Sequence, residues 1–120
     1  MKVFVYYNLH KHLWSIKALE GENKGRVIAH RKTVWLTNAV PKVSEAGRLR
    51  VLKEQRKNVH AGIVGHWRDA DMPIVSNDYW VPVTYNPYKY ETFVYVDNEY
   101  VEWLGAPNAL LHERKVWSVE

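Results

Sequence analysis

The sequence SEAGRLRVLKEQRKNVH at residues 44–60 decides the predicted fold, because it is the one convincing helical stretch in the chain. Ser44 is a favoured N-cap, and Glu45 lies in the first turn, where the helix dipole favours a carboxylate. Leu49 and Leu52 share an apolar stripe with Val59, at helical spacing. We therefore expect one helix over 44–58, with Leu49 and Leu52 against a sheet.

The sequence on both sides of this helix has the composition and alternation of β-strands. Val, Ile, Tyr, Thr and Trp dominate short runs that turn signals separate. Asp97-Asn98 predicts a hairpin turn, and Pro82 predicts an edge strand. These patterns predict an α+β fold over a single domain of residues 1–120: an antiparallel, strongly twisted or partly closed sheet with one main helix packed across it. The expected strands are 3–7, 13–19, 26–30, 33–36, 59–67, 79–85, 92–96, 99–103 and 116–119.

Charge is divided unevenly along the chain. Residues 1–70 hold 14 Lys and Arg against 5 Asp and Glu, whereas residues 71–120 hold 3 against 8. The first part therefore has a net charge of +9 and the second a net charge of −5. Either the two parts pair with each other, or the basic part faces an anionic ligand while the rest supplies the scaffold.

Bulk composition excludes several classes of protein. The chain has no cysteine, so disulfides and thiolate metal sites are excluded. Its apolar runs are far shorter than the roughly 20 residues of a membrane-spanning helix. The start, MKVFV, lacks the apolar region of a signal peptide and is interpreted as a first strand. We expect a cytoplasmic protein without a cofactor.

The helical stretch carries a dense run of cations, which suits contact with phosphate groups. The alternative is a solvated helix face that pairs with the acidic part of the chain. We predict His60 and Tyr88 as specificity contacts beside this run. The predicted phosphate-binding residues are Arg48, Arg50, Lys53, Arg56 and Lys57.

A second basic cluster lies in the first strands, among aromatic residues. Cations and rings on an exposed sheet can neutralise phosphates and stack on bases, although the same rings can instead form the core. No RNP-type motif is present. The cations are Lys24, Arg26, Arg31 and Lys32, and the rings are those of Tyr6, Tyr7, Trp14 and Trp35.

The histidines suggest two further kinds of site. His10, His12 and His30 could bind a metal, but their spacing matches no known metal motif, so we expect none. His60 and His66 could act as acid and base in a phosphodiesterase or nuclease. Neither is followed by the His-x-Ser/Thr pattern that a two-histidine phosphodiesterase requires, and a structural role is the alternative for both.

Two blocks of sequence resemble small uncharacterised bacteriophage and prophage proteins. One is VFVYYNLH at 3–10, and the other runs from Ser44 to Gly65. The resemblance covers about half the chain and implies a small accessory protein made in an infected or lysogenic bacterial cytoplasm. It implies no established activity and no catalytic residues.

Together these features predict a binding module without enzymatic activity, whose ligand carries phosphate. That ligand is a nucleic acid or a nucleotide, contacted through the basic helix face. Two alternatives remain open at this point. One is a histidine-based phosphodiesterase or nuclease that uses His60 and His66, and the other is a protein that binds and antagonises a host enzyme.

Overall fold

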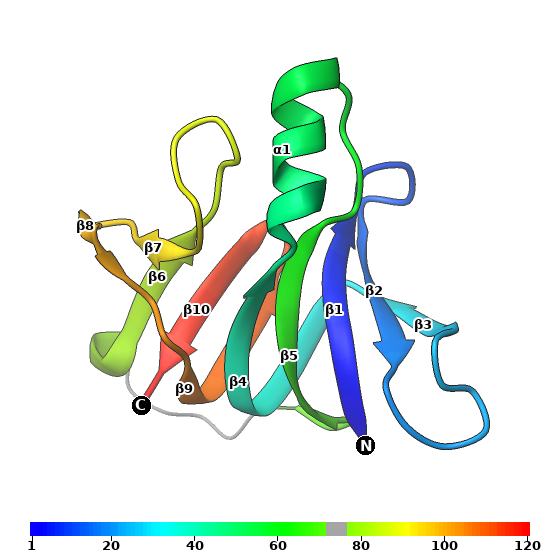
Figure 1. The fold of residues 1–120 in the computed structure, drawn as a ribbon. Coiled ribbons are helices and arrows are strands. Elements are labelled where there is room, and N and C mark those ends of the chain that lie inside the picture. Colours follow the sequence, from blue (N-terminus) through cyan, green and yellow to red (C-terminus); the bar gives the residue numbers. More distant parts are fainter. Residues whose placement is uncertain (72–76) are drawn as a thin grey trace.

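The chain forms one sheet of antiparallel strands (Figure 1), in a computed structural model that describes residues 1–71 and 77–120. The described residues also include one α-helix, α1 (Glu45–Glu54), and a short 3-10 helix at Asn77–Tyr79. The strands are β1 (Lys2–Asn8), β2 (Leu13–Ala18), β3 (Val27–Arg31), β4 (Thr33–Val43), β5 (Ala61–Arg68), β6 (Trp80–Thr84), β7 (Val94–Tyr95), β8 (Asn98–Glu102), β9 (Ala106–His112) and β10 (Lys115–Val119).

The lateral order of the strands is β3-β2-β1-β5-β4-β9-β10-β6-β7-β8. Every paired neighbour runs antiparallel. The predicted α+β class is therefore wrong, because the described chain is nearly all β. In Figure 1, α1 projects beyond the ends of the strands and does not lie across a face of the sheet.

Strand β1 shows why the alternating sequence forms a two-faced strand. Val3 and Val5 are fully buried, whereas Phe4 and Tyr6, which alternate with them, are half-buried on the opposite face. Val5 lies opposite Ile16 of β2 and Ile63 of β5, which are also buried. Since side chains alternate along a strand, one face of β1 builds the core and the other faces outward.

Strand β4 bends the sheet. The register with β5 shifts between Thr37 and Val40, and Asn38 takes a positive φ of 51° in the bend. On β5, a Cβ atom at Gly65 would lie 2.9 Å from the carbonyl oxygen of Thr37, so only glycine lets the bent strand approach so closely. The bend lets residues 33–39 pair with β9 while the strand continues along β5.

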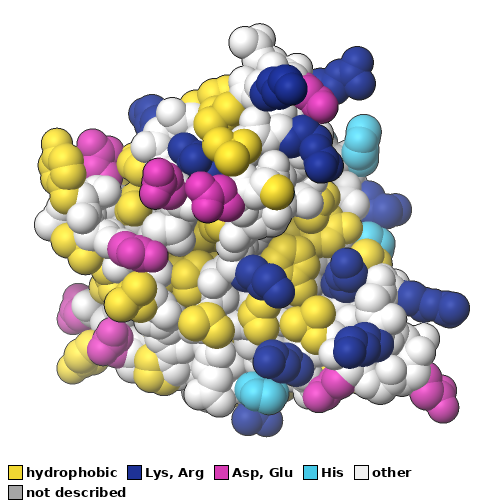
Figure 2. All heavy atoms as spheres, viewed as in Figure 1, with side chains coloured by type: hydrophobic (Ala, Val, Ile, Leu, Met, Phe, Trp, Pro, Cys, Tyr) yellow, Lys and Arg dark blue, Asp and Glu magenta, His cyan; other side chains and the backbone are white. Residues whose placement is uncertain are grey.

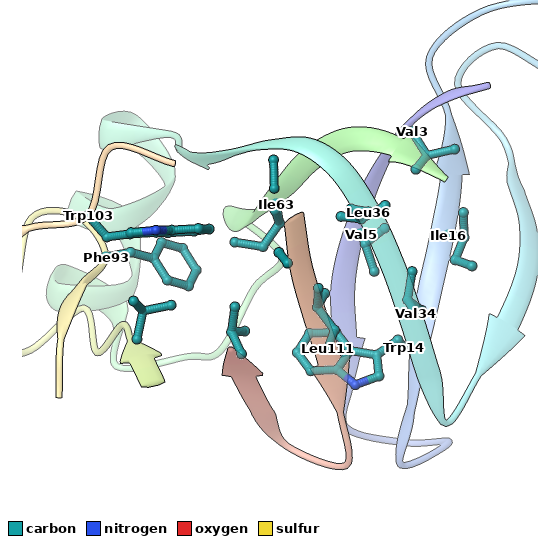
Figure 3. Close-up of a cluster of buried hydrophobic side chains, with 14 residues drawn as sticks. Val3, Val5, Trp14, Ile16, Val34, Leu36, Ile63, Phe93, Trp103 and Leu111 are labelled. Atoms are coloured by element: carbon teal, nitrogen blue, oxygen red, sulfur yellow. The ribbon is translucent and has the colours of Figure 1, made fainter. Parts of the chain in front are cut away.

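The core fills the inside of this curved sheet (Figure 3). Val34 and Leu36 of β4 contribute from one side, and Leu111 of β9 lies opposite Val34 in the register. At one end of the cluster Trp103 is fully buried, and its indole N–H donates to Ser118 Oγ at 3.0 Å. Its ring meets that of Phe93 edge-on, with centroids 6.2 Å apart.

The helix is shorter than predicted and packs through a different residue. Ser44 is the N-cap, as predicted, and accepts a hydrogen bond from the Gly47 N–H at 3.2 Å. The helix stops at Gln55, which takes the left-handed conformation that ends many helices. Leu49 is 51% exposed and so does not contact the sheet, whereas Val51 is 2% exposed. Leu52, the other predicted contact, is half-buried. The predicted stripe is therefore wrong for Leu49, and the buried residue of the helix is Val51.

Pro82 lies on an interior strand, so the predicted edge position is wrong. Strand β6 stands between β10 and β7, with Pro82 opposite Trp117. On the β7 side, the Val96 N–H donates to the Pro82 carbonyl at 3.1 Å. Proline fits because β7 is only two residues long and the ladder requires no donor there.

The described part of the chain holds no helix long and apolar enough to span a membrane.

Candidate functional site

His60 stands where α1 joins the sheet and is fixed by backbone contacts. Its carbonyl accepts from the Ser44 N–H at 2.7 Å, which ties the start of the helix to the start of β5. A Cβ atom at Gly47 would lie 2.5 Å from the His60 Cβ. Glycine has a low intrinsic helix propensity, so Gly47 reduces the stability of the helix. Because it has no side chain, however, it allows the helix to pack directly on His60.

The His60 imidazole bridges two polar groups. Its Nδ1 lies 3.0 Å from Asn58 Oδ1 and 3.1 Å from the Asn58 carbonyl, both of which are acceptors. Nδ1 therefore carries the proton, and Nε2 accepts from the Tyr85 hydroxyl at 2.7 Å. Burial raises the pKa of Tyr85, and the nearby Arg48 charge opposes that rise. The pair is a hydrogen-bonded contact between the 55–60 segment and the residue that follows β6.

A cavity of about 550 Å³ opens beneath α1, inside the curve of the sheet. Val51 forms part of its roof, and His60 and Tyr85 form part of its wall. Rings from β1, β2 and the segment between β6 and β7 also line it: Tyr6, Tyr7, Trp14, Tyr85 and Phe93. Two cations from connecting segments, Lys57 and Arg114, complete the lining.

A smaller hollow of about 220 Å³ lies on the other face of the sheet. Phe4, Val64 and two lysines, Lys17 and Lys42, line it, and His60 lines both this hollow and the cavity. We call this the outer face, defined by Phe4 and Tyr6 of β1, Lys17 of β2, Val64 of β5 and Lys42 of β4. One strand layer separates Phe4, Lys17 and Val64 of the outer face from the cavity, whereas Tyr6 borders both surfaces and His60 lines both hollows.

The predicted phosphate-binding residues do not share one surface. Arg48 is half-buried, and its Nε donates to the Tyr90 carbonyl at 3.0 Å, so it anchors the 86–90 turn. Lys57 lines the cavity. Tyr88 is 60% exposed on the 86–90 turn, outside both hollows. The remaining predicted cations are exposed: Arg50, Lys53 and Arg56.

The basic and acidic parts of the chain do not neutralise each other. Among the described residues other than Asp78, no carboxylate forms an ion pair with a lysine or an arginine. His112 Nε2 and Glu113 Oε1 lie 3.6 Å apart, and they form an ion pair when the imidazole is protonated. Figure 2 shows Lys and Arg gathered over α1 and the β1–β3 side, and most Asp and Glu over the β7–β8 side. The two kinds of charge thus occupy different parts of the surface.

The second basic cluster and its rings separate in the structure. Trp14 is 5% exposed in the core, and the Trp35 indole N–H donates to Asn108 Oδ1 at 2.9 Å. Arg31 lies over the Trp67 ring, 5.4 Å from its centroid. Of the four predicted rings, Tyr6 alone belongs to the outer face. Phe4 was not predicted, although its alternation with Val3 and Val5 was the signal that could have placed it there.

The candidate histidine sites are not assembled. His30 Nδ1 lies 2.9 Å from the buried Ser15 hydroxyl, and the described chain holds no group of three His, Asp or Glu side chains able to share a metal ion. His66 lies six residues beyond His60 on β5, about 20 Å away along a strand. It is exposed and does not line the cavity, so the two imidazoles do not share a site.

Two comparisons link the chain to bacteriophage proteins, and the predicted resemblance is confirmed. A family model described as "Mycobacterium phage L5 gene 82 protein" matches residues 1–119. The gene 82 protein of Mycobacterium phage L5 is 41% identical over 123 residues, covering 97% of this chain and 94% of that protein. No solved structure matches the chain.

Proposed function

We propose that this chain, which belongs to the family of the Mycobacterium phage L5 gene 82 protein, is a phage accessory protein that binds single-stranded nucleic acid on its outer face. One observation carries the proposal. The rings of Phe4 and Tyr6 share the solvent-facing side of adjacent strands with two lysines, Lys17 and Lys42. Among the described carboxylates other than Asp78, none forms an ion pair with these lysines.

The strand order positions the rings between the cations. Lys17 lies opposite Phe4 in the β1–β2 register, and Lys42 lies opposite Gly62 in the β4–β5 register. Because β2, β1, β5 and β4 are consecutive neighbours, the two lysines are about 14 Å apart across the sheet. A nucleic-acid strand that crosses this face meets a cation on each side and rings in the middle.

The Phe4 ring is held by a glycine of the next strand. A Cβ atom at Gly62 would lie 2.8 Å from two atoms of that ring and 2.3 Å from the Val5 carbonyl, so the ring lies over the bare backbone of β5. The Tyr6 ring is its neighbour, with centroids 6.1 Å apart. Stacking of bases on such rings tolerates any sequence, since every base has a π face.

The helix extends the basic surface beyond the sheet. Its N-cap, Ser44, lines the outer hollow together with Lys42, so the helix begins at the edge of the outer face. Arg50 and Lys53 are exposed on the helix and free of ion pairs within the described chain. They supply further phosphate contacts if the bound strand continues past β4 toward the helix.

Binding without cleavage fits the geometry better than a phosphodiesterase reaction. The His60 ring is already engaged by Asn58 and Tyr85, and His66 lies at the far end of β5. His66, the second histidine of the predicted phosphodiesterase, is therefore not placed to act on the same phosphate as His60.

Fluorescence anisotropy with labelled oligonucleotides tests the proposal. We expect single-stranded DNA or RNA to bind more tightly than a duplex of the same length. Phe4→Leu and Tyr6→Leu should each weaken binding about tenfold, because a base-stacking contact is worth about 1–3 kcal/mol. Tyr100→Leu is the matched control, since Tyr100 is 94% exposed on β8, far from the outer face in the strand order.

Two outcomes would contradict the proposal. One is an affinity for single strands that neither outer-face variant changes. The other is the absence of binding at low salt together with capture of a folded host protein through the same surface, which would favour the antagonist of a host enzyme. Thermal melting of each variant separates a loss of binding from a loss of folding.

A further inference from the structure

We propose that the cavity beneath α1 is a second site, which binds a nucleoside monophosphate or a planar anion of the same size. The site lies across the strand layer from Phe4 and Lys17 of the outer face, with Tyr6 at the border of both, and it does not depend on the function proposed above. Its volume of about 550 Å³ lies within the usual range of about 300–1,000 Å³ for small-molecule sites.

Two aromatic pairs line the cavity from different parts of the fold. Tyr7 and Trp14 meet edge-on at 5.2 Å, on the β1–β2 side. Tyr85 and Phe93 stack at 5.2 Å with an interplanar angle of 26°, on the β6–β7 side. Aromatic walls of this kind select a flat ring over a branched aliphatic ligand, since ring faces and edges attract each other.

The charged groups of the lining are all cationic. Lys57 comes from the segment after α1 and Arg114 from the β9–β10 turn, and neither forms an ion pair within the described chain. The Arg114 guanidinium lies over the Tyr7 ring, 5.4 Å from its centroid. No Asp or Glu is among the described residues of the lining, so an anionic ligand meets no repulsion there.

One polar group in the wall lacks a partner. The Trp14 side chain is 5% exposed, and its indole N–H makes no hydrogen bond in the described chain. That nitrogen has less than 1 Å² of accessible surface, so a ligand in the cavity would contact the Trp14 ring and not its N–H. The indole N–H resonance therefore reports on a ligand through the ring beside it.

Amide NMR titration and calorimetry with AMP, adenosine and inorganic phosphate as probes test the site. We expect AMP to shift the Trp14 indole N–H resonance, assigned through Trp14→Phe, together with the amides of Tyr7 and Tyr85. Adenosine and phosphate should each bind at least about tenfold more weakly than AMP, because each keeps only one of the two recognised features.

Arg114→Gln should weaken AMP binding about tenfold, because it removes a charge-assisted hydrogen bond to the phosphate. Lys115→Gln is the matched control: Lys115 is the next residue, carries the same charge and does not line the cavity. Oligonucleotide binding by Arg114→Gln should stay unchanged, so failure of this site and failure of the outer face are distinguishable.

Three results would overturn the inference. The first is no shift of the Trp14 indole at any AMP concentration that leaves the protein folded. The second is a set of shifts confined to outer-face residues such as Phe4 and Lys17. The third is equal weakening of AMP binding by Arg114→Gln and Lys115→Gln, which would show a diffuse response to net charge.

Discussion

The two faces of strand β1 differ in chemistry, although they belong to the same seven residues. Val3 and Val5 are fully buried against β2 and β5, and Tyr7 continues that inner side into the cavity. Phe4 and Tyr6 face outward beside lysines of neighbouring strands. A period-two sequence can therefore build a core on one side and an outward row of aromatic side chains on the other, with a single backbone layer between them.

Neighbouring residues of β5 give the largest expected contrast between these faces. Ile63 is 1% exposed in the core, whereas Val64 lies half-buried on the outer face. Ile63→Ala should reduce the free energy of unfolding by about 2–5 kcal/mol, because it removes buried apolar surface and leaves a cavity. Val64→Ala should cost about 1 kcal/mol or less. Denaturant unfolding followed by circular dichroism measures both, and equal losses would mean that the outer face is itself a packed core.

The helix offers a second and smaller contrast. Val51 is 2% exposed and roofs the cavity, whereas Leu49 is 51% exposed. Val51→Ala should reduce the free energy of unfolding by about 1.5–3 kcal/mol, which is the worth of burying a valine side chain. Leu49→Ala should change it by no more than about 0.5 kcal/mol. The reverse order in the same unfolding experiment would restore the stripe predicted from the sequence.

The contact between His60 and Tyr85 gives the smallest effect and a dependence on pH. Tyr85→Phe removes one partly buried hydrogen bond and should cost about 0.5–1.5 kcal/mol near neutral pH. Burial raises the Tyr85 pKa above 10.0, so the folded state holds this proton more tightly than the unfolded state. The contribution of protonated Tyr85 to the free energy of unfolding is therefore complete below pH 10.0, and it is lost as the pH rises through the pKa of Tyr85 in the folded state.

Stability measured across alkaline pH checks the sign of this effect. Wild type should lose more stability than Tyr85→Phe as the pH rises above 10.0, although other tyrosines titrate in both proteins. A mutant that loses as much as wild type would show that Tyr85 does not contribute to the alkaline loss.

Local sequence predicted the strands better than it predicted how they are assembled. The alternation in residues 3–7 and the cap at Ser44 were sufficient, because both depend on neighbouring residues. Strand β9 was missed, because Gly105 and Pro107 indicated a break. Gly105 does turn the chain, with φ of 122°, but β9 begins at the next residue. The helix end at Gln55 had no signal, since glutamine is rarely left-handed.

The candidate sites were predictable only where one segment supplies them. Lys57 and His60 were singled out from the helical stretch, and both line the cavity. Arg114 approaches Tyr7 from across the curved sheet, so nothing in its local sequence indicates that contact. The outer face was missed for the same reason, because Lys17 and Lys42 become neighbours of Phe4 only through the order β2-β1-β5-β4.

The salt dependence of single-stranded oligonucleotide binding shows whether the lysines of the outer face neutralise phosphates. The double variant Lys17→Gln/Lys42→Gln should flatten the slope of log affinity against log salt by about 1.4, from about 0.7 for each phosphate that the protein no longer neutralises. Lys89→Gln, an exposed cation in the acidic part of the chain, is the control and should leave the slope unchanged. An unchanged slope in the double variant, or equal flattening by the control, would contradict phosphate binding at the outer face.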